Sequence, residues 1–208
     1  MIKLSKNIEF PPHNQTDVHG ILAYGGDLQP ERLKLAYELG IFPWFNPNEP
    51  ILWWFPNPRF ILFPSELEVS KSMRKILKDE IFTFTENIDF EAVIRNCSQI
   101  NRPNQEGTWI TEAMIEAYIE LHKMGLAKSV EVWQNGELVG GFYGVEGENI
   151  FCGESMFAKA SNASKAGFIY FVQKYAQHYQ LIDCQVYTEH LESLGAREIS
   201  SDEFLGYL

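Results

Sequence analysis

The sequence of 208 residues lacks several features that define simple classes of protein. It has only three cysteines, and the wide spacing of Cys97, Cys152 and Cys184 suits neither a disulfide framework nor a metal site. No apolar run approaches the ~20 residues that a bilayer span requires, and residues 1–12 lack the apolar core of a signal peptide. These absences predict a globular, cytoplasmic protein without a membrane segment.

Basic residues are also scarce. Lys and Arg number 17 against 28 Asp and Glu, so the formal net charge is −11. This balance argues against general coating of nucleic acid, because non-specific binding scales with the number of phosphates neutralised. It leaves room for one local basic contact and favours a cationic substrate. The hydrophobic fraction of 45% and the aromatic fraction of 14% suffice for a folded core and exclude global disorder.

Two regions of the chain differ in composition. Residues 1–60 hold eight of the ten prolines and three of the five tryptophans. Because proline breaks regular elements, this region is expected to have short elements, with one readable helix over 30–39. Beyond it the hydrophobic periodicity becomes regular. We therefore expect a small N-terminal lobe over 1–62 and a larger domain over 63–208.

The larger region alternates helices and strands. Its strongest signal is Asn135-Gly136, which predicts a hairpin between strands over 129–134 and 137–143. Further helices are expected over 70–77, over 90–97, from a cap at Thr111 to 124, from a cap at Ser161 or Asn162 to about 178, and over 188–194. Further strands are expected over 81–85, 149–154 and 181–187, and a polar loop is expected over 98–107. The pattern predicts an α+β fold with a mixed sheet flanked by helices, in the order found in acyltransferases of the N-acetyltransferase (GNAT) superfamily.

Motifs for three common chemistries are absent. The sequence has no G-x-x-x-x-G-K-[ST] phosphate loop, no H-E-x-x-H and no G-x-S-x-G. Acetyl-CoA enzymes of the N-acetyltransferase superfamily place a glycine-rich pyrophosphate cradle before the helix expected near residue 162. Residues 158–161, Ala-Lys-Ala-Ser, contain no glycine, which argues against a coenzyme A donor.

The strand expected over 181–187 carries a carboxylate and an amide. Strand alternation places Asp183 and Gln185 on one face, with their Cα atoms about 7 Å apart. Such a pair can orient an amine and accept its proton, directly or by relay, and a purely structural pair is the alternative. Glu154 ends another strand among apolar neighbours, which raise the pKa of a carboxyl group. It could bind an ammonium group or nearby backbone donors.

Two further groups of side chains suggest nucleic-acid contact. The proline-stiffened aromatic segments 41–45 and 51–56 offer either stacking faces for bases of single-stranded RNA or a small core. One concentrated basic stretch lies on one side of the helix expected over 70–77 and comprises Lys71, Arg74, Lys75 and Lys78. It fits either a phosphate backbone or a solvated helix face.

Nine short segments carry a more specific signal. They are Gly20–Leu28, Gly40–Phe45, Pro50–Trp54, Gly107–Ile110, Ser129–Trp133, Val139–Gly141, Gly153–Phe157, Asn162–Lys165 and Leu181–Gln185. In this order they resemble the leucyl/phenylalanyl-tRNA–protein transferase family, and the resemblance runs from about residue 10 to the C-terminus. It implies a small N-terminal lobe with an N-acetyltransferase-like domain. The implied activity is transfer of Leu or Phe, with Met as a candidate third donor, from aminoacyl-tRNA to proteins that begin with Arg or Lys. That transfer marks the acceptor for degradation and requires neither metal nor cofactor.

The resemblance also implies roles for particular residues. Glu154 would position the substrate, and Asp183 and Gln185 would serve the attacking α-amine. Trp44 and Trp109 would hold the terminal adenosine of the tRNA, and the basic stretch would meet the acceptor stem. The pocket for the Leu or Phe side chain would be lined by Phe142, Phe151, Phe171 and Ile182.

The sequence departs from the family pattern at several positions, and three alternatives to this interpretation stay open. Phe142 stands where the family more often has Leu or Met, so a narrower pocket is expected. The alternatives are a tRNA-dependent transferase that builds cell-wall cross-bridges, a non-catalytic module that binds basic N-termini, and an acetyl-CoA acyltransferase. We expect the protein to act as a monomer.

Overall fold

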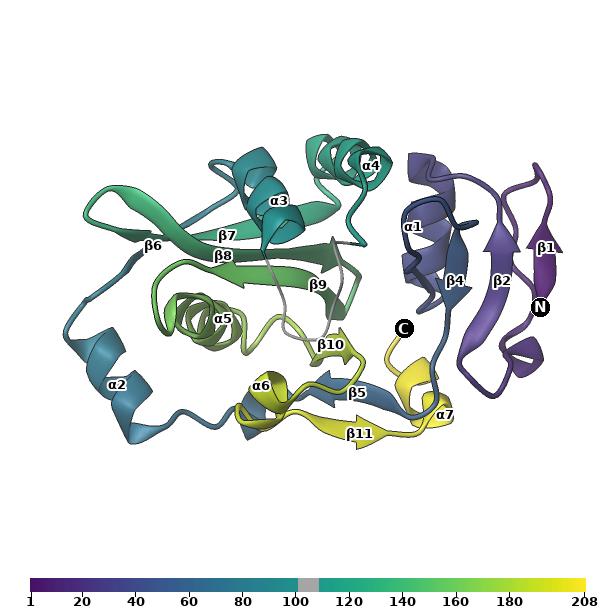
Figure 1. Ribbon diagram of the computed structural model, residues 1–208. Helices are drawn as coiled ribbons and strands as arrows, with labels where there is room; N and C mark the ends of the chain where they lie inside the picture. Colours follow the sequence, from purple (N-terminus) through teal and green to yellow (C-terminus); the bar gives the residue numbers. More distant parts are fainter. Residues whose placement is uncertain (101–108) are drawn as a thin grey trace.

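Two β-sheets organise the computed structural model, which describes residues 1–100 and 109–208 (Figure 1). The smaller sheet has the order β1-β2-β4-β3 and consists of β1 (Ile2–Leu4), β2 (Ile21–Gly25), β4 (Leu52–Trp54) and β3 (Phe42–Pro43). Helix α1 (Pro30–Glu38) belongs to the same lobe and matches the expected helix. It begins with a proline, whose missing N–H costs nothing in the first turn, and Gly40 follows it with φ 68°.

The larger sheet has seven strands in the order β11-β5-β10-β9-β8-β7-β6. They are β11 (Arg197–Ile199), β5 (Arg59–Leu62), β10 (Leu181–Gln185), β9 (Ile150–Ala158), β8 (Glu137–Glu146), β7 (Ala127–Gln134) and β6 (Thr83–Glu86). Only β9 and β10 run parallel to each other in this sheet, so the predicted mixed sheet is confirmed. The division between residues 62 and 63 stays a proposal, and β5, which precedes it, pairs within the larger sheet.

Helices cover both faces of the larger sheet. In Figure 1, α3 (Phe90–Gln99) and α4 (Glu112–Lys123) lie on one side of the strands and α5 (Ala163–Lys174) on the other. The remaining helical segments are α2 (Lys71–Lys78), α6 (Glu189–Glu192), α7 (Ser201–Leu205) and the 3₁₀ turns His13–Gln15 and Pro64–Glu66. The predicted α+β architecture, a small N-terminal lobe and a mixed sheet flanked by helices, is therefore confirmed.

Several expected boundaries differ from the observed ones. Strand β9 continues to Ala158, four residues beyond its expected end, while α5 ends at Lys174 rather than near 178. The Thr111 side chain caps α4 as expected, whereas Asn162 precedes α5 in the left-handed conformation and makes no side-chain cap. Of the polar loop expected over 98–107, residues 98 and 99 belong to α3 and residues 101–107 lie outside the described part.

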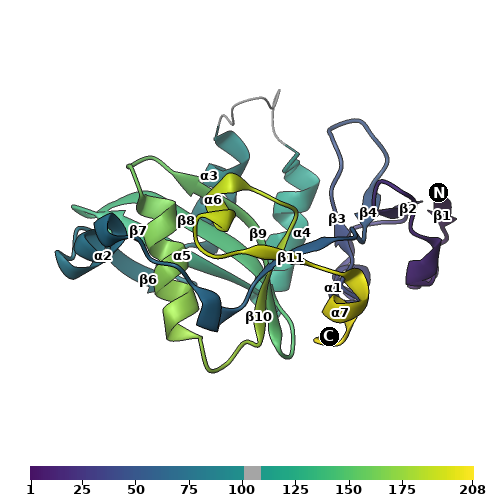
Figure 2. The same ribbon diagram turned by 90° about the horizontal axis from the view of Figure 1, so that it is seen from below.

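The apolar core joins the two sheets. A single cluster includes Leu22 and Trp53 of the N-terminal lobe together with Phe90 of α3 and Tyr118 of α4. A second cluster lies under α5. Figure 2 shows β11 and α7 running from the larger sheet to the N-terminal lobe, so the C-terminal segment also ties the two parts together. Among the described residues, no helix combines the length and apolar character that a bilayer crossing needs.

Candidate functional site

A cavity opens where β9 and β10 separate. The two strands pair from Leu181 opposite Ile150 to Asp183 opposite Cys152, and β9 then continues alone to Ala158 on that side. The cavity has a volume of about 650 Å³. Most of its wall is apolar, and Glu154, Gln185, Ser164 and Thr188 are among its polar lining residues. A small number of polar groups in an apolar enclosure is typical of a ligand-binding site.

A β-bulge on β9 places Glu154 in this wall. Tyr143 of β8 lies opposite Ser155 and Gly144 lies opposite Gly153, so Glu154 is the extra residue between them. A bulge bends its strand and redirects the side chain at the bulge. The sequence suggested Glu154 as a strand end, whereas the strand passes through it.

A second bulge lies on β10. Asp183 and Gln185 face adjacent residues of β5, which leaves Cys184 as the extra residue. Gln185 has φ 65°, and the Val186 N–H donates to the Cys184 carbonyl over 2.8 Å, which makes a γ-turn centred on Gln185. The expected alternation is therefore wrong beyond Asp183. The contact between the two residues runs through the backbone of Gln185, whose N–H donates to Asp183 Oδ1 over 2.9 Å.

Glu154 is the centre of a hydrogen-bond network. Gln185 Nε2 donates to Glu154 Oε1 over 2.7 Å, and the Tyr118 hydroxyl donates to Oε2 over 3.2 Å. The hydroxyls of Tyr37 and Tyr118 are hydrogen-bonded to each other, which extends the network to α1 of the N-terminal lobe. Burial raises the pKa of Glu154 to about 7, although these hydrogen bonds oppose the rise. A carboxyl group with this pKa can take up and release a proton near neutral pH.

Asp183 is held by an arginine that the sequence analysis missed. Arg59 Nε and Nη2 donate to the two carboxylate oxygens over 2.8 and 2.6 Å, and both side chains are only 1% exposed. Asp183 is one of the residues that line the cavity. Both of its carboxylate oxygens are nevertheless bound by Arg59 and its side chain is enclosed, so direct uptake of a proton from an amine in the cavity does not fit this arrangement. The signal that could have revealed Arg59 is its charge at the start of the apolar segment Phe60–Leu62.

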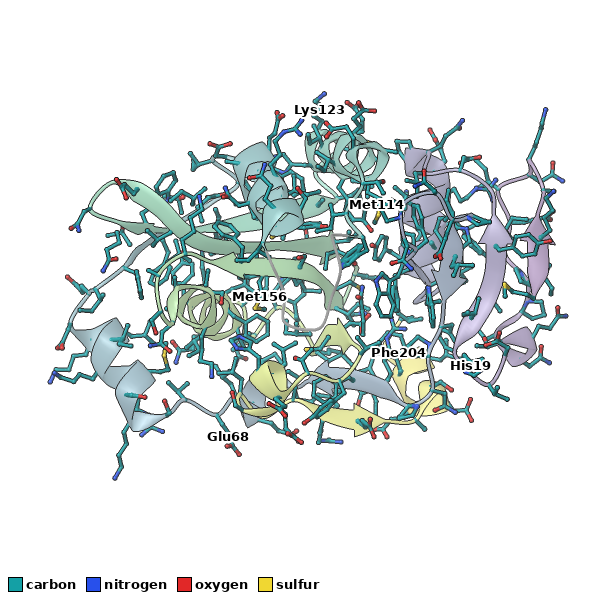
Figure 3. The ribbon with its side chains drawn as sticks, in the orientation of Figure 1. His19, Glu68, Met114, Lys123, Met156 and Phe204 are labelled. Carbon is teal, nitrogen blue, oxygen red and sulfur yellow. The ribbon has the colours of Figure 1, made fainter. Side chains whose placement is uncertain are left out.

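The four residues expected around the aminoacyl side chain divide into two layers. Phe142 and Ile182 line the cavity. Phe151 and Phe171 are buried behind Phe142, with ring centroids 6.2 and 5.3 Å from it, and are not among the lining residues. Sequence reasoning missed several further apolar lining residues, among them Met156 of β9 (labelled in Figure 3), Phe168 and Leu191. Phe168 lies one helical turn before Phe171, which is the pattern that could have identified it.

The two expected tryptophans both line the cavity, and they come from different parts of the chain. Trp44 belongs to the N-terminal lobe and is 37% exposed, whereas Trp109 is buried. Trp54 supports Trp44, because its Nε1 donates to the Trp44 carbonyl over 2.6 Å and the ring centroids are 5.3 Å apart. The structure thus brings both aromatic side chains to the site that contains Glu154 and Gln185.

The basic stretch is separate from this site. Its four residues lie on α2, which Figure 1 places at the end of the molecule opposite the N-terminal lobe, and all four are exposed. Lys75 pairs with Asp79 over 3.5 Å. None of the four lines the cavity, so their contact with tRNA stays a prediction.

Two other chemistries have no support in the described residues. Burial raises the pKa of the Cys152 and Cys184 thiols, and the nearby Asp183 charge adds to the effect, so neither is an activated nucleophile. Residues 1–100 and 109–208 contain no group of three His, Cys, Asp or Glu side chains arranged to hold a metal ion.

Comparison with known proteins gives a consistent family. Residues 61–208 match the family described as leucyl/phenylalanyl-tRNA protein transferase, and residues 26–57 match its N-terminal domain. Proteins named leucyl/phenylalanyl-tRNA–protein transferase in Flavobacterium johnsoniae and Flavobacterium psychrophilum are 60% and 53% identical to this chain. These alignments cover 100% and 99% of this chain and 99% and 98% of the relatives.

Solved structures show weaker likeness. A GCN5-related N-acetyltransferase from Kribbella flavida is 9% identical with a TM-score of 0.39, covering 70% of this chain and 55% of that one. L-PGS from Bacillus licheniformis is 15% identical with a TM-score of 0.43, covering 82% and 57%.

Proposed function

We infer that this chain, which belongs to the leucyl/phenylalanyl-tRNA–protein transferase family, is an enzyme. It transfers an amino acid from aminoacyl-tRNA to the N-terminus of a protein. The proposed donors are Leu-tRNA and Phe-tRNA, with Met-tRNA as a third, and the acceptors are proteins that begin with Arg or Lys. We place the reaction in the cytoplasm, as a step toward degradation of the acceptor, carried out by a monomer. The observation that carries the proposal is an apolar cavity directly beside a carboxyl group whose pKa is about 7.

The chemical step joins two substrates. The neutral α-amine of the acceptor attacks the ester carbonyl carbon of the aminoacyl-tRNA. A bond forms between that nitrogen and the carbonyl carbon, and the bond between the carbonyl carbon and the ribose oxygen breaks. The nitrogen loses a proton and the ribose oxygen gains one, so the step needs no further reactant. The ester is already activated, and the enzyme supplies proximity and a route for the proton.

The apolar part of the cavity is suited to the Leu or Phe side chain. Phe142, Phe168 and Ile182 line it, and Trp44 and Trp109 provide aromatic faces for the terminal adenosine. One methylene in such a pocket changes binding by only about 1–3 kcal/mol, so selection by shape is incomplete. This is consistent with an enzyme that accepts more than one donor.

Gln185 and Glu154 are proposed to handle the amine and its proton. Gln185 Nε2 is committed to Glu154, so the amide oxygen is the atom that accepts a hydrogen bond from the amine. Glu154 then holds the proton on its way to the ribose oxygen, which its pKa permits near neutral pH. Asp183 acts through Gln185, because its own carboxylate is enclosed by Arg59.

The charge of the protein fits the proposed acceptor. A net charge of −11 attracts a peptide with a basic first residue. A cluster of four exposed cations, as on α2, is unusual on such an acidic chain. We propose that this cluster contacts the acceptor stem of the tRNA. Each lost phosphate contact should then reduce the dependence of tRNA binding on salt concentration.

A transfer assay tests the proposed function. The protein is incubated with Leu-tRNA and either a peptide that begins with Arg or the same peptide beginning with Glu. Mass spectrometry should find one leucyl residue added to the Arg peptide alone, with a large loss of transfer in the Gln185→Ala variant. No addition from Leu, Phe or Met donors would refute the proposal. Transfer to a peptidoglycan precursor instead, or saturable binding of coenzyme A, would favour the corresponding alternative.

A further inference from the structure

The turn at Gln185 is strained and must be held by its surroundings. A non-glycine residue at φ 65° in a γ-turn is strained, and such conformations persist only where neighbouring contacts impose them. The turn matters because it sets the direction of the side chain that meets Glu154. A relaxed Gln185 backbone would move its amide away from that carboxyl group.

Asp183 is the contact that holds the turn. Its Oδ1 accepts the backbone N–H of Gln185 over 2.9 Å, and the same oxygen accepts Arg59 Nε over 2.8 Å. Arg59 Nη2 fixes the other oxygen over 2.6 Å. A bidentate pair of this kind fixes the plane of the carboxylate as well as its position. The orientation of the Gln185 N–H bond therefore depends on Arg59.

Arg59 is itself held by two rings from distant parts of the chain. Its guanidinium carbon lies 4.9 Å from the ring centroid of Phe42 and 4.5 Å from that of Phe204. Phe204, labelled in Figure 3, comes from α7 and packs against the N-terminal lobe, where a Cβ added at Gly40 would lie 2.7 Å from its ring. Cation–π contacts with a buried guanidinium are stronger than exposed ones, because little water competes for the charge.

We propose that Arg59 is a positioning residue of the transfer reaction, which holds Asp183 so that the strained turn directs the Gln185 amide to Glu154 and the cavity. The proposal rests on the proposed function for its catalytic part. Arg59 does not touch the substrate and acts through Asp183 and Gln185. Lysine cannot replace it, since a single ammonium group cannot bind both oxygens in a fixed plane or stack between two rings.

The chain contains a matched control for this role. Arg197 of β11 also donates from Nε to a carboxylate, Glu66 Oε2, over 2.8 Å and lies 4.9 Å from the ring centroid of Phe63. Its side chain is 48% exposed, and it does not line the cavity. Arg197→Lys therefore alters the same two kinds of contact, with a carboxylate and with an aromatic ring, at a position that supports no strained turn.

The experiment compares Arg59→Lys, Arg197→Lys and the wild type in two measurements. The first is the side-chain amide NMR signal of Gln185, assigned from its loss in Gln185→Glu. In the wild type this signal should shift with pH around a midpoint of about 7, because the amide reports the ionisation of Glu154. Arg59→Lys should abolish that dependence and Arg197→Lys should preserve it.

The second measurement is transfer under saturating conditions. In Arg59→Lys we expect kcat to fall by about 100-fold, the usual cost of a misplaced reacting group, with KM for Leu-tRNA changed by less than about threefold. Arg197→Lys should keep both constants. Phe204→Leu is the substitute variant if Arg59→Lys does not fold, because it retains both buried charges and removes one stacking face. It should weaken the pH dependence of the Gln185 signal and lower kcat by a smaller factor, about fivefold to tenfold.

The two measurements separate the outcomes. The proposal is overturned if Arg59→Lys, or Phe204→Leu where the first does not fold, leaves the pH-dependent Gln185 signal intact. It is also overturned if the signal is lost while kcat stays within about threefold of the Arg197→Lys value. A wild type that transfers no amino acid would refute the proposed function instead, and the NMR comparison would still decide whether Arg59 positions Gln185.

Discussion

The β7–β8 hairpin and the β9–β10 pair belong to one sheet but are shaped by different forces. The hairpin is antiparallel with a single register shift, and its turn residues Asn135 and Gly136 have φ of 52° and 80°, as a two-residue hairpin turn requires. Strands β9 and β10 pair over three positions and then separate, with bulges beside Glu154 and Gln185. The near-regular region gives the sheet its frame, and the irregular region provides the cavity and its polar groups.

The largest effect is expected from a substitution of Asp183, in the irregular region of β9 and β10. Asp183→Ala leaves Arg59 buried without a partner, so the free energy of unfolding should fall by about 3–5 kcal/mol. Because Gln185 also loses its anchor, kcat should fall by about 100-fold. Asp183→Asn keeps an oxygen for the Gln185 N–H and should retain more activity. Urea unfolding and single-turnover transfer measure both quantities, and a loss below about 1 kcal/mol in Asp183→Ala would contradict this account.

A smaller effect is expected at Glu154, the ionisable group at the bulge of β9, whose burial lowers the free energy of unfolding when the group is charged. Folding raises the pKa of Glu154 from 4.5 to about 7, so the folded wild type binds a proton more tightly than the unfolded chain. Wild-type stability must therefore decrease as pH rises between these two values and stay lower above them. Glu154→Gln lacks this loss, so its free energy of unfolding relative to that of the wild type should rise by about 3 kcal/mol between about pH 4 and pH 8. Urea unfolding at both pH values measures the difference, and a pH-independent difference would refute the shifted pKa.

A change in the pocket wall should alter selectivity rather than stability. Phe142→Leu widens the cavity, so the rate ratio of Phe transfer to Leu transfer should rise by about threefold to tenfold. Competition between Phe-tRNA and Leu-tRNA for one Arg peptide measures the ratio. Phe151→Leu is the matched control, because Phe151 lies behind Phe142, and it should change the ratio less. An equal effect of both variants would mean that the two layers are not distinct.

The smallest effect is expected in the hairpin. Gly136 has φ 80°, and a Cβ added there would meet no atom within 4 Å, so Gly136→Ala introduces backbone strain alone. The free energy of unfolding should fall by about 1–2 kcal/mol, while kcat stays unchanged. Thermal unfolding and the transfer assay give both values. A loss of kcat would show that the hairpin does more than support the sheet.

The sequence predicted best where local rules decide the structure. The Asn135-Gly136 turn, the proline at the start of α1 and the Thr111 cap each act within a few residues, and the structure has all three. The C-terminal elements β11 and α7 were not expected, because their short segments are stabilised by contacts with β5 and the N-terminal lobe.

The candidate site could likewise be predicted only in part, because contacts between distant segments shape it. Asp183 and Gln185 were identified, but the bulge that separates their side chains and the Arg59 ion pair depend on residues more than a hundred positions away. Phe151 and Phe171 were placed in the pocket because residue type and periodicity cannot distinguish a cavity wall from the layer behind it.

The most direct test of the account is the pH dependence of single-turnover leucyl transfer in the wild type and in Glu154→Gln. Ionisation of the acceptor amine, with a pKa of about 7.7–8.0, affects both proteins equally and cancels in the ratio of their rates. We expect this ratio to rise with pH around a midpoint of about 7 and then to level off, as the Glu154 carboxylate forms. A ratio that stays constant across that range would contradict the assignment of the proton to Glu154.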